Sequence, residues 1–218
     1  MKTGVIIFPG SNCDADCYHV IGNVLEQRVE YIWHENLIDD SFDFVILPGG
    51  FSYGDYLRPG AIANHTKVMD SVKEFAAKGK FVLGICNGFQ ILLESGLLPG
   101  ALMTNKDTRF ISKFVDLYLL NSETPFTNRY QRLQLRMPIA HNEGNYYIDD
   151  EGHNTLRENK QIVFIYKDNV NGSVGRIAGI TNKEGNVLGM MPHPERCAEG
   201  ILGSTDGLPL FQAVLNIS

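Results

Sequence analysis

The hydrophobic pattern of the first half of the chain alternates between short apolar runs and longer amphipathic stretches. Short apolar runs predict strands buried on both faces, whereas apolar positions spaced three and four apart predict helices. Strands that alternate with helices favour an α/β fold, with a mostly parallel central sheet flanked by helices on both faces. The predicted strands are Gly4–Phe8, Arg28–Trp33, Phe44–Leu47 and Phe81–Ile85, and the predicted helices are Asp14–Gln27 and Lys67–Lys78.

The second half of the chain has a different pattern, because short β-rich runs follow one another from Phe114 to Met190. No internal repeat, low-complexity tract or linker divides the sequence, and 218 residues with 44% hydrophobic content suffice for one sizeable core. We therefore expect residues 1–218 to form a single domain. Its later elements are predicted as strands at Leu133–Ala140, Ile162–Tyr166, Ile177–Thr181 and Asn186–Leu188, with a last helix at Leu208–Leu215.

The formal net charge of −6, without any cluster of Lys and Arg, argues against binding to nucleic acid and favours a small polar substrate. The apolar run Val5–Phe8 is stopped by Pro9 and Gly10 before it reaches the ~7–15 residues of a secretory signal. No stretch approaches the ~18 apolar residues of a membrane span. These features predict a cytoplasmic protein without membrane association.

Four cysteines occur, in a chain too large to need a disulfide framework. Cys13 and Cys17 are spaced to share a helix face, but a metal site needs further ligands, and only His19 lies near them in the sequence. The pattern therefore favours isolated reduced thiols, and we expect no metal site.

Cys86 is the candidate nucleophile, because it lies between Gly84 and Gly88 where the apolar strand Phe81–Ile85 gives way to a helical pattern. A strand that turns abruptly into a helix brings the flanking backbones into near contact, so both neighbours must be small. Free N–H groups and the macrodipole at a helix start favour a thiolate, which is the form that attacks.

His193 and Glu195 are the candidate base and its orienting carboxylate, in a segment framed by Pro192 and Pro194. The prolines favour extended backbone at the residues that precede them. Residues two apart in an extended chain project to the same side, which would let Glu195 fix the tautomer of His193. Cys86, His193 and Glu195 would then form a catalytic triad.

Each fragment also has a structural interpretation, since a lone cysteine is usually a small buried hydrophobe and a lone histidine a satisfied structural residue. The glycine-flanked Cys86 and the proline-framed His193 and Glu195 occur together, and their combination favours catalysis.

These motifs resemble those of the class I, triad-type glutamine amidotransferases, which have a flavodoxin-like α/β fold. Within that class the chain resembles the family of glutaminase subunits of phosphoribosylformylglycinamidine synthases, from about residue 4 to the C-terminus. One departure is Asn142, where the family pattern leads us to expect glycine. The resemblance rests on residues 8–14, 47–58, 84–90, 140–144 and 191–196, which include Phe8-Pro9-Gly10-Ser11-Asn12-Cys13-Asp14 and Met191-Pro192-His193-Pro194-Glu195-Arg196.

The resemblance implies hydrolysis of glutamine to glutamate and ammonia through a thioester on Cys86. Attack on an amide carbonyl creates an oxyanion that needs two preorganised donors. We assign these donors to the backbone N–H groups of Gly50 and Asn87, although the turn at Gly50 could equally be an ordinary strand end. The family also implies that Gln90 holds the substrate glutamine, and a polar residue on a helix surface is the alternative.

The sequence contains no G-x-x-x-x-G-K-[ST] motif and no G-x-G-x-x-G that opens a helix after the first strand. We therefore expect no cofactor in this chain. The resemblance implies a large synthetase subunit that uses ATP and magnesium to convert formylglycinamide ribonucleotide, and a small accessory subunit of the same complex.

Other functions remain compatible with these residues: a glutaminase subunit that serves a different synthetase, a cysteine peptidase or other hydrolase, or a catalytically silent scaffold. The sequence also leaves open whether Asp55, Arg58 and His141 line the site, form an interface or are solvated loop residues.

Overall fold

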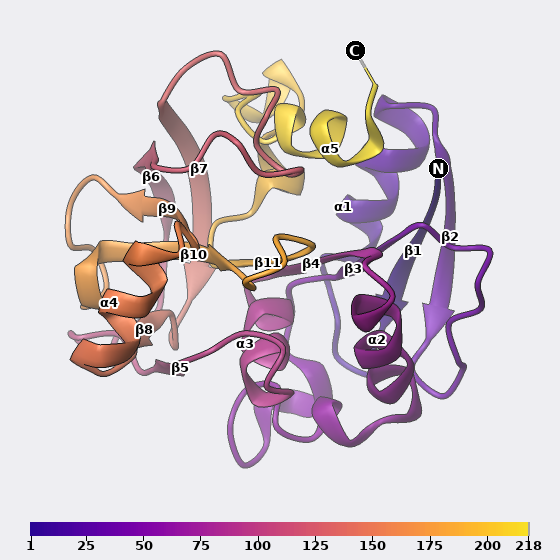
Figure 1. Cartoon of the computed structure of the whole chain (residues 1–218), viewed down its shortest axis with the longest axis horizontal. Helices are drawn as coiled ribbons and strands as arrows, with labels where there is room; N and C mark the ends of the chain where they lie inside the picture. Colours follow the sequence, from indigo (N-terminus) through magenta and orange to yellow (C-terminus); the bar gives the residue numbers. More distant parts are fainter. Residues whose placement is uncertain (218) are drawn as a thin grey trace.

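Nine strands form one continuous sheet in the computed structural model, which describes residues 1–217 (Figure 1). The strand order is β2-β1-β3-β4-β11-β10-β9-β6-β7, and a separate pair is formed by β5 and β8. The first five strands in this order are parallel to one another, and the other four are antiparallel to their neighbours. The strands are β1 (Lys2–Ile7), β2 (Arg28–Trp33), β3 (Phe44–Leu47), β4 (Phe81–Ile85), β5 (Ala101–Met103), β6 (Ile111–Leu119), β7 (Gln134–His141), β8 (Asn145–Tyr147), β9 (Ile162–Tyr166), β10 (Ile177–Thr181) and β11 (Val187–Met190).

Helices cover both faces of the parallel half, which confirms the predicted α/β fold. In Figure 1, α2 and α3 lie on one side of the sheet, and α1 and α5 lie on the other. In α2, the apolar residues Val68, Met69, Val72 and Phe75 are buried at helical spacing. The helices are α1 (Asp14–His19), α2 (Lys67–Ala77), α3 (Asn87–Glu94), α4 (Asp150–Glu158) and α5 (Leu208–Leu215).

The parallel strands were predictable because burial on both faces makes them uniformly apolar. All four residues of β3 have no exposed surface. The prediction for Asp14–Gln27 was too simple, because α1 ends at His19 and passes into a π-helical segment, Val20–Val24. Gly22 in that segment packs closely against Val29 and Tyr18.

Three elements of the second half, β6, β8 and α4, were not predicted. The strand β6 alternates in exposure near its centre, and α4 buries only Leu156, so neither produces a strong apolar run. The start of α4 is instead fixed by Asp149, whose side chain accepts a hydrogen bond from the N–H of Gly152 at 2.8 Å.

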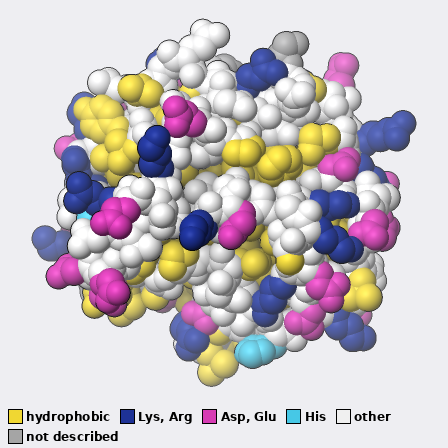
Figure 2. Space-filling view, in the orientation of Figure 1, with side chains coloured by type: hydrophobic (Ala, Val, Ile, Leu, Met, Phe, Trp, Pro, Cys, Tyr) yellow, Lys and Arg dark blue, Asp and Glu magenta, His cyan; other side chains and the backbone are white. Residues whose placement is uncertain are grey.

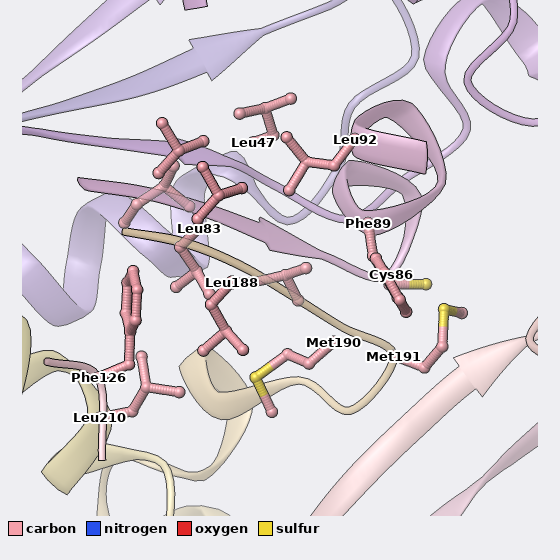
Figure 3. Packing of buried hydrophobic residues seen from close by; sticks show 14 of the residues in the cluster. Leu47, Leu83, Cys86, Phe89, Leu92, Phe126, Leu188, Met190, Met191 and Leu210 are labelled. Atoms are coloured by element: carbon pink, nitrogen blue, oxygen red, sulfur yellow. The ribbon is translucent and has the colours of Figure 1, made fainter. Parts of the chain in front are cut away.

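The carboxyl ends of the parallel strands bring distant segments to one edge of the sheet. Gly10 follows β1, Gly49 follows β3, Cys86 follows β4 and His193 follows β11. Figure 3 shows Cys86 and Met191 at one end of the buried apolar cluster, away from Leu210. The packed core thus supports the edge where ligands of open α/β sheets bind.

The surface carries charges of both signs. On the face drawn in Figure 2, Lys and Arg side chains are interspersed with Asp and Glu, without a large region of one sign. None of the helices in residues 1–217 has the length and apolar content needed to cross a membrane.

Candidate active site

Cys86 occupies a sharp turn between β4 and α3. Its φ of 50° and ψ of −105° are unusual for a residue with a side chain, and α3 begins at the next residue. The N–H of Cys86 donates to the carbonyl of Met190 at 2.8 Å, and its carbonyl accepts from the N–H of Gln90 at 3.1 Å. The turn is therefore held from both sides, as expected for a nucleophile elbow.

The two glycines around Cys86 are required by close backbone packing, as the sequence predicted. A Cβ added to Gly84 would lie 2.7 Å from the carbonyl of Gly88. A Cβ added to Gly88 would overlap the carbonyl oxygen of Leu47 in the neighbouring strand.

Gly49 lets the imidazole of His193 approach Cys86. A Cβ added to Gly49 would lie 2.8 Å from Cε1 of His193, 3.0 Å from Sγ of Cys13 and 3.4 Å from Cβ of Cys86. Three side chains from the loops after β1, β4 and β11 therefore converge on one residue of the loop after β3.

His193 and Glu195 are joined by a short contact of 2.6 Å between Nδ1 and Oε1. His193 has the expected extended backbone, with φ −101° and ψ 90°. The expectation that the whole segment is extended was wrong, because Pro194–Cys197 forms a 3-10 turn that contains Glu195. Proline fits the first position of such a turn, and the turn folds the carboxylate back onto the ring.

The protonated form of His193 is favoured in this setting. Burial of the ring opposes protonation, but the Glu195 carboxylate and the neighbouring thiols of Cys86 and Cys13 outweigh it, and the pKa of His193 lies well above its usual value. The ring can therefore accept the proton of Cys86 and keep it while Glu195 compensates the charge.

A small cavity of about 110 Å³ opens beside Cys86. Its walls come from the loop that follows β3, from the start of α3 and from residues 140–143 at the end of β7. Residues from these three segments include Gly50, Asp55, Gln90 and His141.

The backbone N–H groups of Gly50 and Asn87 donate no hydrogen bond within residues 1–217, and Gly50 lines the cavity. Gly50 has a φ of 145°, and its Cβ position would clash with the backbone of Asn12 and Ser11. The glycine thus allows the loops after β1 and β3 to lie together, where Phe51 N–H donates to the carbonyl of Gly10 at 3.0 Å.

Gln90 is a buried wall residue of this cavity rather than a residue on a helix surface. Its Oε1 accepts from Nδ2 of Asn87 at 2.9 Å, and its Nε2 donates to the carbonyl of Glu143 at 2.8 Å. Asn87 also accepts from the N–H of Ser52 at 3.0 Å. These bonds connect the three walls of the cavity.

The residues left open by the sequence now separate into two groups. Asp55 and His141 line the cavity, and the exposed Asn142 lies at the same wall. Arg58 instead forms an exposed ion pair with Glu94, with Nε to Oε1 at 2.6 Å. Position 142 faces outward, which explains why a side chain larger than glycine fits there.

Sequence reasoning missed Cys13 as a neighbour of the pair His193 and Glu195. Its signal was its position just after the first strand, because the loops after parallel strands meet at one edge. The N–H of Cys13 donates to the carbonyl of Gly49 at 3.2 Å, which holds it there.

Residues 1–206 match the family model described as the CobB/CobQ-like glutamine amidotransferase domain, and the chain belongs to this family. It is 53% identical over 217 residues to the phosphoribosylformylglycinamidine synthase subunit PurQ of Alkaliphilus metalliredigens, covering 99% of this chain and 96% of that protein. A chain in the structure of PurLQS from Thermotoga maritima is 46% identical, with a TM-score of 0.90 and coverage of 99% and 97%.

More distant structures share the fold alone. The glutaminase domain of CTPS from Trypanosoma brucei, solved with bound acivicin, is 13% identical with a TM-score of 0.64, covering 100% of this chain and 95% of that one.

Proposed function

We propose that this chain is the glutaminase subunit of a phosphoribosylformylglycinamidine synthase, which hydrolyses glutamine and supplies ammonia for purine biosynthesis. The observation that carries the proposal is the strained turn at Cys86, which lies beside a small cavity and beside the imidazole of His193. Nδ1 of that imidazole is held by Glu195. The full-length similarity to PurQ supports this choice of glutaminase over a cysteine peptidase or a silent scaffold.

In the first half of the reaction, His193 accepts the proton of Cys86, and the thiolate attacks the side-chain amide carbon of glutamine. The N–H groups of Gly50 and Asn87 stabilise the oxyanion. The imidazolium then gives its proton to the departing ammonia, which leaves a γ-glutamyl thioester on Cys86.

In the second half, His193 takes a proton from water, and the resulting hydroxide attacks the thioester. Collapse of the second oxyanion releases glutamate and returns the proton to Cys86. Glu195 keeps the ring oriented and stabilises its charge in both halves.

Replacing Glu195 with glutamine is expected to lower kcat for glutamine hydrolysis about 10³-fold, because the amide cannot stabilise the imidazolium. The pKa of His193 should fall, so the limb of the kcat profile that reports this ring should move to lower pH. Steady-state kinetics across pH test both effects.

Glu199→Gln is the matched control, because it makes the same replacement in another Glu–His pair that is exposed. In that pair, Oε1 of Glu199 lies 2.8 Å from Nε2 of His19. Equal losses of activity in the two variants, or an unmoved pH profile in Glu195→Gln, would contradict the role of Glu195.

The α-ammonium group of the substrate glutamine is expected to bind near Asp55 and Glu143 at the cavity wall. Burial, with the nearby Glu143 charge, raises the pKa of Asp55 to about 6, although a hydrogen bond from Asn87 opposes the shift. Below that pH Asp55 becomes neutral and loses its attraction for a cation, so KM for glutamine should rise as pH falls through about 6.

In Asp55→Asn, KM should be raised at about pH 7.5 and should change much less on acidification to about pH 5.5. Two other titratable residues, Glu143 and His141, also line the cavity. Burial, together with the nearby charge of His193, lowers the pKa of His141 to about 4, so His141 stays neutral between about pH 5.5 and 7.5. Exposed Asp70→Asn should behave as wild type. A KM profile in Asp55→Asn identical to wild type would exclude Asp55 from substrate binding.

The chain is proposed to act with a large synthetase subunit and a small accessory subunit, and its similarity to a chain in the structure of PurLQS supports this proposal. ATP and magnesium belong to the synthetase, and we infer a cytoplasmic location from the role in purine biosynthesis. Glutamate release should rise when purified synthetase, ATP and formylglycinamide ribonucleotide are added. Hydrolysis of peptides or esters without stimulation by the synthetase would instead support an independent hydrolase.

A further inference from the structure

A thiol other than that of Cys86 lies against the pair of His193 and Glu195, and the proposed mechanism does not use it. Sγ of Cys13, a ring nitrogen of His193 and a carboxylate oxygen of Glu195 lie within 4.8 Å of one another. Each of these residues is 2% exposed. The sulfur of Cys13 is oriented by Asn12, whose Oδ1 accepts from it at 3.1 Å.

Two polar atoms in this cluster have no hydrogen-bond partner within residues 1–217, although both are buried. They are Nε2 of His193 and Oε2 of Glu195. Buried polar atoms without partners are rare, because each costs free energy of desolvation. Two of the three residues of the cluster therefore have a polar atom that is free to accept a ligand.

We propose that Cys13, His193 and Glu195 bind one zinc(II) ion, which switches off the glutaminase. Sulfur, imidazole nitrogen and carboxylate oxygen form a typical zinc ligand set, and a water molecule can complete the tetrahedron. Magnesium prefers oxygen ligands in octahedral geometry and should not compete.

Binding requires a modest rearrangement. Zinc bonds of about 2.0–2.3 Å place tetrahedral ligand atoms roughly 3.5 Å apart. Separations in the cluster extend up to 4.8 Å at most, so they must shrink by up to about 1.3 Å. The contact between Glu195 and His193 must also open. Cys13 releases its thiol proton and the imidazolium releases one ring proton to solvent, because zinc binds the thiolate and the neutral ring.

The cation can enter through the cavity beside Cys86, which is next to the cluster. A metal on His193 and Glu195 removes the base and its orienting carboxylate from the reaction. The loss of glutamine hydrolysis rests on the proposed function, whereas zinc binding itself does not.

Zinc binding is measured by calorimetry on the full chain, and cobalt(II) reports thiolate ligation through its charge-transfer absorption. Wild type and Cys86→Ala should each bind one ion, because Cys86 is not a required ligand. Cys13→Ala should bind at least about 100-fold more weakly, and Cys13→Ser provides a second variant of nearly native size. Cys17→Ala is the matched control, since that buried thiol lies outside the cluster.

Zinc should inhibit glutamate release, and a chelator should restore it, whereas magnesium at the same concentration should have no effect. For each variant, the zinc concentration that halves its own metal-free rate is measured. In Cys13→Ser this concentration should rise by the same factor as the zinc dissociation constant. Equal zinc affinity in wild type and both Cys13 variants would overturn the proposal, as would loss of binding in Cys86→Ala alone. If the chain binds zinc through Cys13 but never hydrolyses glutamine, the proposed function fails and the metal site stands.

Discussion

Replacing Cys86 with alanine is expected to abolish glutamine-dependent synthesis by the complex and to leave ammonia-dependent synthesis intact. Alanine has no nucleophile, so the thioester cannot form. Without the Cys86 thiolate, the oxyanion donors at Gly50 and Asn87 accelerate glutamine hydrolysis only slightly. The expected loss in kcat for glutamine hydrolysis is about 10⁴-fold or more. Added ammonia bypasses this chain, because the ATP-dependent step is proposed to occur on the synthetase.

The measurement compares glutamate release and product formation by the reconstituted complex, first with glutamine and then with an ammonium salt. Cys17→Ala serves as the control, because that residue is a buried thiol of α1 outside the cavity. Loss of both activities in Cys86→Ala, with normal assembly of the complex, would contradict the proposed division of labour. Retained glutamine-dependent activity would exclude Cys86 as the nucleophile.

Replacing Gly88 with alanine should destabilise the chain, although alanine normally stabilises a helix by up to about 1 kcal/mol relative to glycine. Gly88 lies in α3 directly against β3, and the added methyl group would overlap the carbonyl oxygen of Leu47. Because the obstacle is backbone within the sheet, no side-chain rotation relieves it. We expect a loss of about 3 kcal/mol in the free energy of unfolding, at the upper end for overpacked sites.

The added methyl group should also push α3 away from β3, and Cys86 should move with it because α3 begins at the next residue. Glutamine hydrolysis should therefore fall even where the variant remains folded. Urea unfolding and steady-state kinetics measure the two effects. Gly200→Ala is the control, since Gly200 is exposed and its added Cβ meets no atom within 4 Å. A Gly88→Ala variant as stable and active as wild type would refute the close packing at the elbow.

The parallel half of the fold was predictable because its signals are local. The strands Arg28–Trp33, Phe44–Leu47 and Phe81–Ile85 were predicted with the bounds that the structure has. In the antiparallel half, Ile162–Tyr166 and Ile177–Thr181 were also predicted with the bounds of the structure. The elements β6 and α4 were missed, because each has one face toward solvent and a weak apolar pattern.

For the site, the residue types and their flanking glycines and prolines indicated Cys86, His193 and Glu195 as candidates. The local geometry was only partly predictable, because the 3-10 turn at Pro194–Cys197 replaces an expected extended segment. Gln90 was open to a surface interpretation, and its burial became evident only from the opposing wall at Glu143.

The order of the parallel strands, the position of the elbow and the chemical types of the triad could all be predicted from the amino-acid sequence, because short-range sterics and periodic burial control these features. The three-dimensional arrangement was needed to show that Asp55 and His141 line the cavity, that Arg58 pairs with Glu94, and that Cys13 lies beside His193. The reason is the parallel sheet, which brings the ends of β1, β3, β4 and β11 to one edge although they are far apart in the chain.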